Sequence, residues 1–140
     1  MEYKIIDKRV VIRLDVGDEI VQAISDIAEQ ENIKLGVVTG IGAVDKATIG
    51  VFKPKEKKYY ANDFEGDYEL LALNGNVSTM DDKTYVHLHI TLGDDLGHAF
   101  GGHLNEAYIS VTGEIFIDII DGQVDRSVDP VTELNIFKFD

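Results

Sequence analysis

Apolar residues between positions 18 and 31 recur with the period of an α-helix. They fall at every third or fourth residue, as the stripe that a helix turns toward a hydrophobic core does. The stripe consists of Ile20, Ala23, Ile24, Ile27 and Ala28. Asp18 and Glu19 stand at the start of the pattern, where negative charge favours the positive end of the helix dipole, and Asn32 suits the left-handed conformation that ends a helix. The pattern therefore predicts one helix over about residues 18–31.

Most of the remaining chain has the composition of β-strands. Several segments are rich in β-branched and aromatic residues and are separated by Gly, Asn and Asp, which favour turns. These segments are Val10–Leu14, Leu35–Val38, Ala47–Phe52, Tyr68–Val77, Tyr85–Leu92, Tyr108–Ile120 and Leu134–Phe139. Because strands follow one another through most of the chain, mainly antiparallel pairing is expected. The sequence thus predicts an α+β domain: a mainly antiparallel β-sheet with one principal α-helix.

Two further segments are interpreted as connections. The stretch KPKEKK at 53–58 is predicted to be a solvated hairpin turn. In TGIGAVDKATIG, Gly40 and Gly42 suggest a dinucleotide-binding loop, but Asp45 stands where GxGxxG requires its third glycine, and a strand-like segment follows instead of a helix. We therefore predict a tight turn between two strands here, with close packing of the backbone.

Composition limits the class of protein. With 140 residues, 44% of them hydrophobic, the chain is expected to form a single domain over residues 1–140. It contains no apolar run long enough for a membrane helix, and its start, MEYKIIDKR, is unlike a signal peptide, so a cytoplasmic protein without membrane contact is expected. Cysteine is absent, which excludes disulfides and thiolate ligands. The net charge of -13 opposes contact with nucleic-acid phosphates.

All four histidines lie between positions 87 and 103. In the predicted strand TYVHLHITL, alternate residues point to opposite faces, so His87 and His89 share one face. The opposite, apolar face consists of Val86, Leu88, Ile90 and Leu92. Residues two apart on a strand have Cα atoms about 6.5 to 7 Å apart, a spacing from which two imidazoles reach one metal ion. This His-x-His motif predicts two ligands of a divalent-metal site.

The segment GDDLGHAFGGH, interpreted as a loop, offers two candidates for a third ligand, His98 and His103. We favour His103, because Gly101 and Gly102 before it allow the backbone to come close to the strand. His98 is the reserve candidate. Three neutral imidazoles would leave a fourth tetrahedral position for water or a ligand, which is typical of an open zinc site.

Four carboxylates in this part of the chain are weighed as partners of such a site. Asp94 and Asp95 could orient an imidazole from outside the metal shell, although a polar turn explains them more simply. Glu114 and Asp118 share one face of the predicted strand 108–120 and could supply a general base, although an exposed strand face accounts for them equally well. No catalytic residue is therefore assigned.

Four blocks of the sequence resemble the PPC domain, the plants and prokaryotes conserved domain. They are VIRLDVGDEI, VVTGIGAVDKATIG, GDYELLALNGNVS and HLHITLGDDLGHAFGGHL, and the resemblance covers nearly the whole chain. It implies an α+β domain that forms a homotrimer and binds a metal through His87, His89 and His103. Plant members carry an AT-hook, an Arg-Gly-Arg segment that binds the minor groove, and act in transcription; this sequence has no such segment.

These observations support three functional hypotheses. The leading one is a homotrimeric PPC module that binds one zinc or other divalent ion per chain and serves a regulatory role or binds a small ligand or a protein partner. The second is DNA binding in transcriptional regulation, which the family favours and the charge of -13 opposes; the lysines at 53–58 are the one basic cluster. The third is an enzyme in which the metal activates water.

Overall fold

The computed structural model of the chain describes residues 1–139 and has one helix and eight strands. In chain order the elements are β1 (Glu2–Ile6), β2 (Arg9–Leu14), α1 (Ile20–Gln30), β3 (Gly36–Lys53), β4 (Lys58–Met80), β5 (Lys83–Gly93), β6 (Ala99–Ile119), β7 (Asp125–Val128) and β8 (Asn135–Lys138). All strand pairs are antiparallel except a single contact between β4 and β7. The predicted α+β class, mainly antiparallel with one principal helix, is confirmed.

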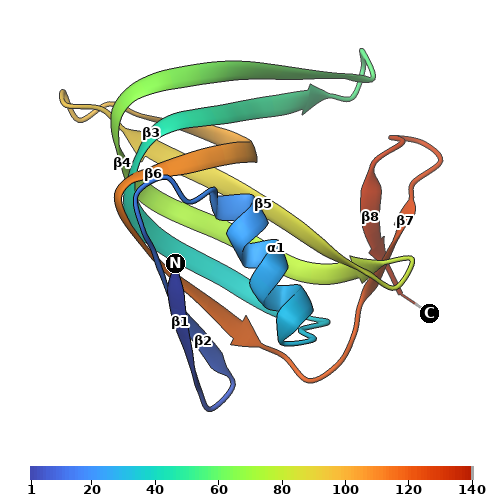
Figure 1. Cartoon of the computed structure of the whole chain (residues 1–140). Coiled ribbons are helices and arrows are strands. Elements are labelled where there is room, and N and C mark those ends of the chain that lie inside the picture. Colours follow the sequence, from blue (N-terminus) through green and yellow to red (C-terminus); the bar gives the residue numbers. More distant parts are fainter. Residues whose placement is uncertain (140) are drawn as a thin grey trace.

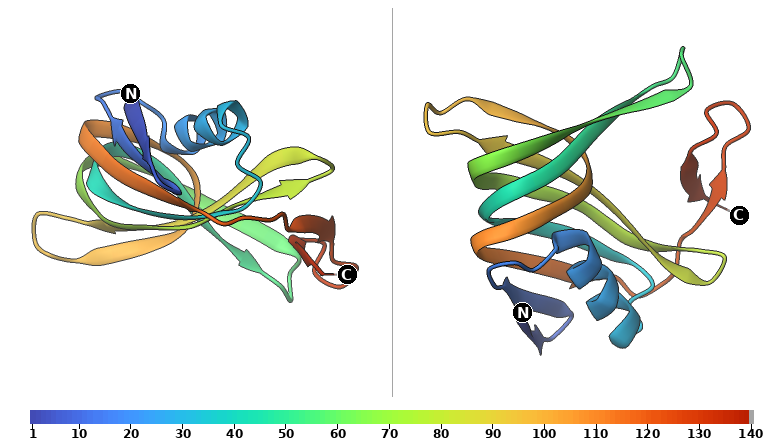
Figure 2. Two further views of the ribbon diagram at one scale, coloured as in Figure 1. Left: turned by 90° about the horizontal axis from the view of Figure 1, so that it is seen from below. Right: turned by 45° about the horizontal axis from the view of Figure 1, so that its top comes forward.

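Strands β3, β4, β5 and β6 form a closed ring, since each of them pairs with two of the others. The long strands β3, β4 and β6 bend near their middles and curl around α1 (Figure 1). Irregularities in the pairing of β3 near Gly40 and Val44 account for the bend, because an extra residue in one strand kinks it and increases its twist. Figure 2 shows the β1–β2 hairpin next to the helix, and the β7–β8 hairpin at the opposite end of the sheet.

The predicted turn at Gly40 and Gly42 is wrong: residues 36–53 form one continuous strand. The close backbone packing expected there does occur, since a Cβ on Gly42 would lie 2.3 Å from the carbonyl oxygen of Thr112. Glycine thus allows β3 to bulge against β6 without ending the strand. Two strands were not predicted, β1 and β7, both of them short elements with few buried side chains.

The helix has the predicted position and face. All five residues of the predicted stripe are buried. Glu19 caps the start, because its carboxylate accepts hydrogen bonds from the backbone N–H groups of Val21 and Gln22, at 3.0 and 2.6 Å. Asn32 has φ 52°, and the N–H of Ile33 donates to the carbonyl oxygen of Ala28 at 2.8 Å, which closes the helix end as predicted. The described residues contain no helix with the length and apolarity needed to cross a membrane.

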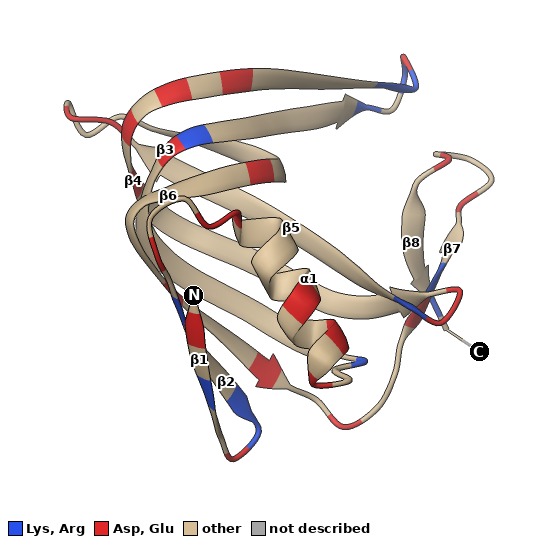
Figure 3. Ribbon diagram, viewed as in Figure 1, with Lys and Arg blue, Asp and Glu red and all other residues tan. Residues whose placement is uncertain are grey.

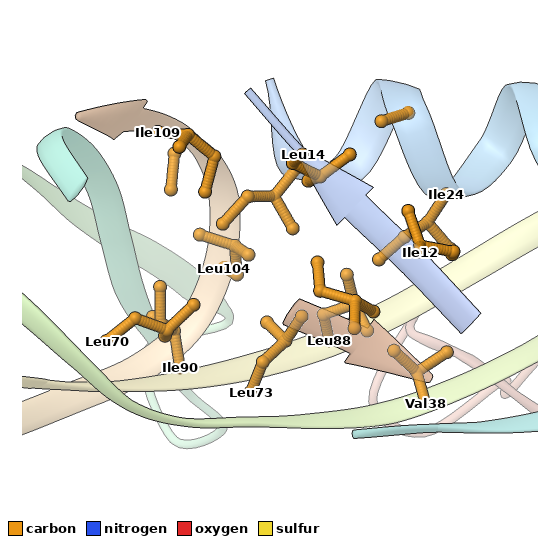
Figure 4. Close-up of a cluster of buried hydrophobic side chains, with 14 of the residues drawn as sticks. Ile12, Leu14, Ile24, Val38, Leu70, Leu73, Leu88, Ile90, Leu104 and Ile109 are labelled. Atoms are coloured by element: carbon orange, nitrogen blue, oxygen red, sulfur yellow. The ribbon is translucent and has the colours of Figure 1, made fainter. Parts of the chain in front are cut away.

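The hydrophobic core lies between α1 and the concave side of the bent sheet (Figure 4). In β5, Leu88, Ile90 and Leu92 are buried in this core, so the predicted apolar face of the strand is confirmed. Alternation along the strand then turns His87 and His89 to the other side of the sheet. The predicted solvated turn at 53–58 is confirmed: residues 54–57 connect β3 to β4, and all four of these connecting residues are exposed.

Candidate metal centre

His87, His89 and His103 come together on the outer face of the sheet, where β5 lies beside β6. His89 and His103 are register partners across the two strands, and His87 lies two residues before His89. The ring centroid of His87 lies 5.2 Å from the centroid of His89 and 5.2 Å from that of His103, and the centroids of His89 and His103 are 5.7 Å apart. The structure therefore unites the three favoured residues in one triangular cluster.

The donor set of this cluster fits a divalent transition metal. One ring nitrogen from each histidine lies within 4.8 Å of the other two. On a tetrahedral zinc with Zn–N distances of about 2.0–2.1 Å, bound nitrogens are about 3.3 Å apart, so small rotations of the rings are enough to close the site. Three imidazoles without a carboxylate or thiolate suit zinc and its neighbours and leave one position open.

His103 lies on strand β6, and the prediction that it sits in a loop is wrong. The connection between β5 and β6 is shorter than expected, and the strand already begins at Ala99. Gly101 explains how β6 comes so near to β5: a Cβ at this position would lie 2.0 Å from the carbonyl oxygen of Ile90. The predicted role of the glycine, close approach of the backbone, therefore holds although the local structure is extended.

Burial keeps two of the three imidazoles neutral. It lowers the pKa of His87 from the ordinary value of 6.5 to about 4, helped by the positive charges of His103, Arg126 and His89. Burial and the charge of His89 also lower the pKa of His103. Neutral rings present free lone pairs, which is the form that binds a metal, so this cluster is ready to coordinate at neutral pH.

The cluster opens into a cavity of about 850 Å³. One wall carries Tyr59, whose ring meets His103 edge-on with centroids 5.8 Å apart. The β7–β8 hairpin and the connection before β8 supply further lining residues, among them Arg126, Leu134, Ile136 and Phe137. Mainly apolar walls with a few polar groups are typical of small-molecule sites.

Sequence reasoning missed the contribution of this hairpin. Arg126 belongs to a strand that was not predicted, and it is one of three arginines, with no motif around it. Asn76 on β4 and Tyr85 on β5 also line the cavity. Tyr85 stands two residues before His87, so the strand alternation that assigned the histidines also places this ring on their face.

His98, the reserve ligand, does not join the cluster. Its side chain is 73% exposed, and its Nδ1 lies 3.0 Å from a carboxylate oxygen of Asp94. Asp94 also accepts hydrogen bonds from the backbone N–H groups of Leu96 and His98. The polar-turn interpretation of Asp94 and Asp95 is therefore the right one, and neither residue lines the histidine cavity.

The two carboxylates weighed as general bases also lie elsewhere. Asp118 forms an ion pair with Arg9 on the neighbouring strand β2. Glu114 lines a separate hollow together with Ile41, Leu71 and Val111. Within residues 1–139, the carboxylate that lines the histidine cavity is Glu133, and it pairs with Lys57 at 2.8 Å.

Fold and site together define an α+β domain with a candidate three-histidine metal centre at the edge of a ligand-sized cavity. The family model described as the Plants and Prokaryotes Conserved (PCC) domain matches residues 1–121. The chain therefore belongs to this family, the one abbreviated PPC above, and the resemblance noted in the sequence is confirmed.

Solved structures of similar chains extend the match beyond residue 121. A candidate DNA-binding protein from Bacteroides thetaiotaomicron is 33% identical, with a TM-score of 0.96 over 99% of this chain and 96% of that one. A metal-containing protein from Archaeoglobus fulgidus is also 33% identical, with a TM-score of 0.89 over 99% and 97% of the two chains. A PPC protein from Pyrococcus horikoshii is 28% identical, with a TM-score of 0.86 over 99% and 95%.

Two curated relatives are much longer than this chain. They are the bifunctional protein GlmU of two Synechococcus strains, each 30% identical, over 133 and 130 residues. The matches cover 91% and 86% of this chain but only 20% and 18% of those proteins. The chain thus spans about a fifth of the length of these relatives.

Proposed function

We propose that this protein is a metal-binding PPC module in which His87, His89 and His103 hold one divalent ion per chain, zinc in the first instance, at the entrance to a small-ligand cavity. The observation that carries the proposal is the convergence of three imidazole nitrogens within 4.8 Å of one another. The similarity to the metal-containing Archaeoglobus fulgidus protein supports it. A bound ion with a free position would act as a Lewis acid toward an oxygen atom of the ligand.

The test is metal content after purification without an affinity tag. Elemental analysis of dialysed protein should give about one zinc per chain, as the ligand count requires. His103→Gln should lose the metal, because only two of the three imidazole ligands remain to hold it. His98→Gln is the matched control: it makes the same change in an exposed histidine outside the cluster and should retain the metal. Wild-type protein that takes up no zinc would refute the proposal.

The homotrimer implied by the family resemblance is part of this proposal. Three exposed apolar side chains support it, Ile41, Leu71 and Val111, with exposures of 56%, 49% and 67%. They line a hollow of about 410 Å³ that shares no lining residue with the histidine cavity. Grouped apolar side chains on a soluble domain commonly mark an interface between protein chains, so we assign this surface to contacts between subunits.

DNA binding is the second candidate function, favoured by the similarity to the candidate DNA-binding protein of Bacteroides thetaiotaomicron. In the ribbon of Figure 3, lysines gather at the tip of the β3–β4 hairpin, further basic residues lie on the β1–β2 hairpin, and acidic residues are spread along most of the other elements. Two of those lysines are already engaged, Lys53 with Glu56 and Lys57 with Glu133. Salt-dependent affinity for duplex DNA at low ionic strength would support this candidate, and its absence would exclude it.

A further inference from the structure

Arg126 is a buried cation in the wall of the histidine cavity, and it is 7% exposed. Its guanidinium donates three hydrogen bonds, all of them to neutral oxygens. Nε donates to Oγ of Ser78 at 2.8 Å, one terminal nitrogen donates to the carbonyl oxygen of Asn135 at 2.8 Å, and the other donates to Oδ1 of Asn76 at 2.9 Å. A guanidinium carries five N–H groups, so these bonds leave two of them for a further acceptor.

No carboxylate neutralises this charge within the part of the chain that the structure describes. Arg126 forms no ion pair with any Asp or Glu of residues 1–139, although the chain contains 26 acidic residues. Glu133, the carboxylate of the cavity wall, is engaged by Lys57. A buried charge is normally paired, and arginine stays protonated in proteins, so residues 1–139 leave this positive charge without a counter-ion.

The guanidinium lies at the same end of the cavity as His87. Asn76, which accepts one of its hydrogen bonds, is the register partner of His87 across β4 and β5. The guanidinium carbon lies 4.6 Å from the ring centroid of Tyr85 and 4.3 Å from that of Phe137. These aromatic faces fix the plane of the fork, and a fixed fork suits two oxygens of one anion.

We infer that the cavity binds a small organic anion, whose carboxylate or phosphate oxygens contact Arg126 and face the three histidines while its apolar body rests on Val51, Leu134 and Ile136. This inference rests on the proposed function, since it names the ligand class of the same site. A divalent ion held by neutral imidazoles would add two positive charges beside Arg126, and an anionic ligand compensates them. The overall charge of -13 would repel such a ligand elsewhere on the surface, so the local charge selects the site.

The β7–β8 hairpin and its approach supply one part of the cavity wall, since Arg126, Leu134, Ile136 and Phe137 all belong to residues 125–138. The hairpin lies beyond residue 121, where the match to the family model ends. It is held to the sheet by the bonds of Arg126 to Ser78 and Asn76 on β4. The same side chain therefore positions the wall and supplies the charge.

The test is a calorimetric titration at pH 7.5 with benzoate, phenyl phosphate and neutral benzyl alcohol as probes, on metal-free and on Co²⁺-loaded protein. Metal-free protein should bind the better anion at least tenfold more tightly than benzyl alcohol, because Arg126 alone prefers an anion. In the Co²⁺ form, the preferred anion should also change the visible absorption of the ion. The two anions distinguish a carboxylate from a phosphate head group.

Arg126→Gln should weaken binding of the preferred anion by about ten- to a hundredfold more than it weakens binding of benzyl alcohol, since the lost charge acts on the anion alone whereas any shift of the wall affects both probes. Arg13→Gln is the matched control, since it removes the same charge from an exposed side chain outside the cavity, and it should bind like wild type. If Arg126→Gln does not fold, the comparison of the anionic probes with benzyl alcohol on wild-type protein still decides whether the cavity prefers an anion. Equal binding of anion and alcohol to metal-free protein overturns the inference, whereas failure to take up Co²⁺ overturns only the metal proposal.

Discussion

Gly101→Ala is the substitution that most directly tests how the histidine cluster is assembled. The new Cβ would lie 2.0 Å from the carbonyl oxygen of Ile90 and 3.0 Å from the Cα of Thr91. Ordinary contacts at this position begin at 3.4 Å. Both neighbours are backbone atoms of β5, so no side-chain rotation relieves the clash, and β6 has to move away from β5 by more than about 1 Å.

The displacement has two measurable consequences. Overpacking against backbone is expected to destabilise the protein by about 3 kcal/mol, the upper end of the usual range. For a chain of this length, about 3 kcal/mol corresponds to a fall in Tm of about 10 °C. His103 follows Gly101 by two residues on the same strand, so it moves away from His89, and zinc affinity should fall by about ten- to a hundredfold.

Both effects are measured on the same samples, by thermal unfolding of the metal-free protein and by zinc titration against a chelating indicator. Gly97→Ala is the control, because it adds the same methyl group in the β5–β6 turn, at a position with open space. Its φ of 81° makes alanine unfavourable there, so a modest loss of stability with unchanged zinc affinity is expected. Gly101→Ala with wild-type Tm would refute the assigned packing of β5 on β6.

Three further predictions concern pH, the helix cap and assembly. Burial lowers the pKa of His87 to about 4, so the unfolded chain binds more protons than the folded chain between about pH 6.5 and 4. The free energy of unfolding of the metal-free protein should therefore fall by about 1–2 kcal/mol as the pH falls through this window, a value already reduced because the His87 ring is half-exposed. Urea unfolding at pH 7.5 and 4.5 measures this loss, and His87→Gln should diminish it; an unchanged pH dependence in that variant would contradict the assignment. Glu19→Ala removes the acceptor for Val21, Gln22 and the N–H of Ala107 on β6, so it should cost about 1–2 kcal/mol in urea unfolding; the same loss in Glu29→Ala, an exposed residue of the helix, would show that the cap is unimportant. Leu71→Glu should reduce the mass in light scattering from three chains to one of 15.5 kDa, and a trimer that survives this change would place the interface elsewhere.

Helix α1 and the two faces of β5 could be predicted from the sequence, because both depend on the period of local side-chain alternation. The helical stripe and the apolar face of Leu88, Ile90 and Leu92 needed only residue spacing. The same rule put His87 and His89 on one side of the strand. The residue pattern around a glycine cannot distinguish a bulged strand from a turn, however. For that reason the sequence predicted two strands with a turn between them where residues 36–53 form one strand.

The choice of the third histidine illustrates the boundary between local and tertiary information. Residue type and spacing left His98 and His103 open, with Gly101 and Gly102 as the argument for His103. The pairing of β5 with β6 placed His103 directly opposite His89 and left His98 exposed in a turn beside Asp94. Register between strands depends on long-range packing, which the order of residues does not display.

The sequence by itself determined the class of the domain, its helix, the two faces of β5 and the histidines available for a metal, because these properties follow from residue chemistry and short-range periodicity. Only the tertiary structure decided the other half of the site. Arg126, Phe137 and Tyr59 come from segments distant in the chain, and no spacing relates them to the histidines. These side chains line one cavity because β3, β4, β5 and β6 form a closed ring and because Arg126 holds the β7–β8 hairpin against β4.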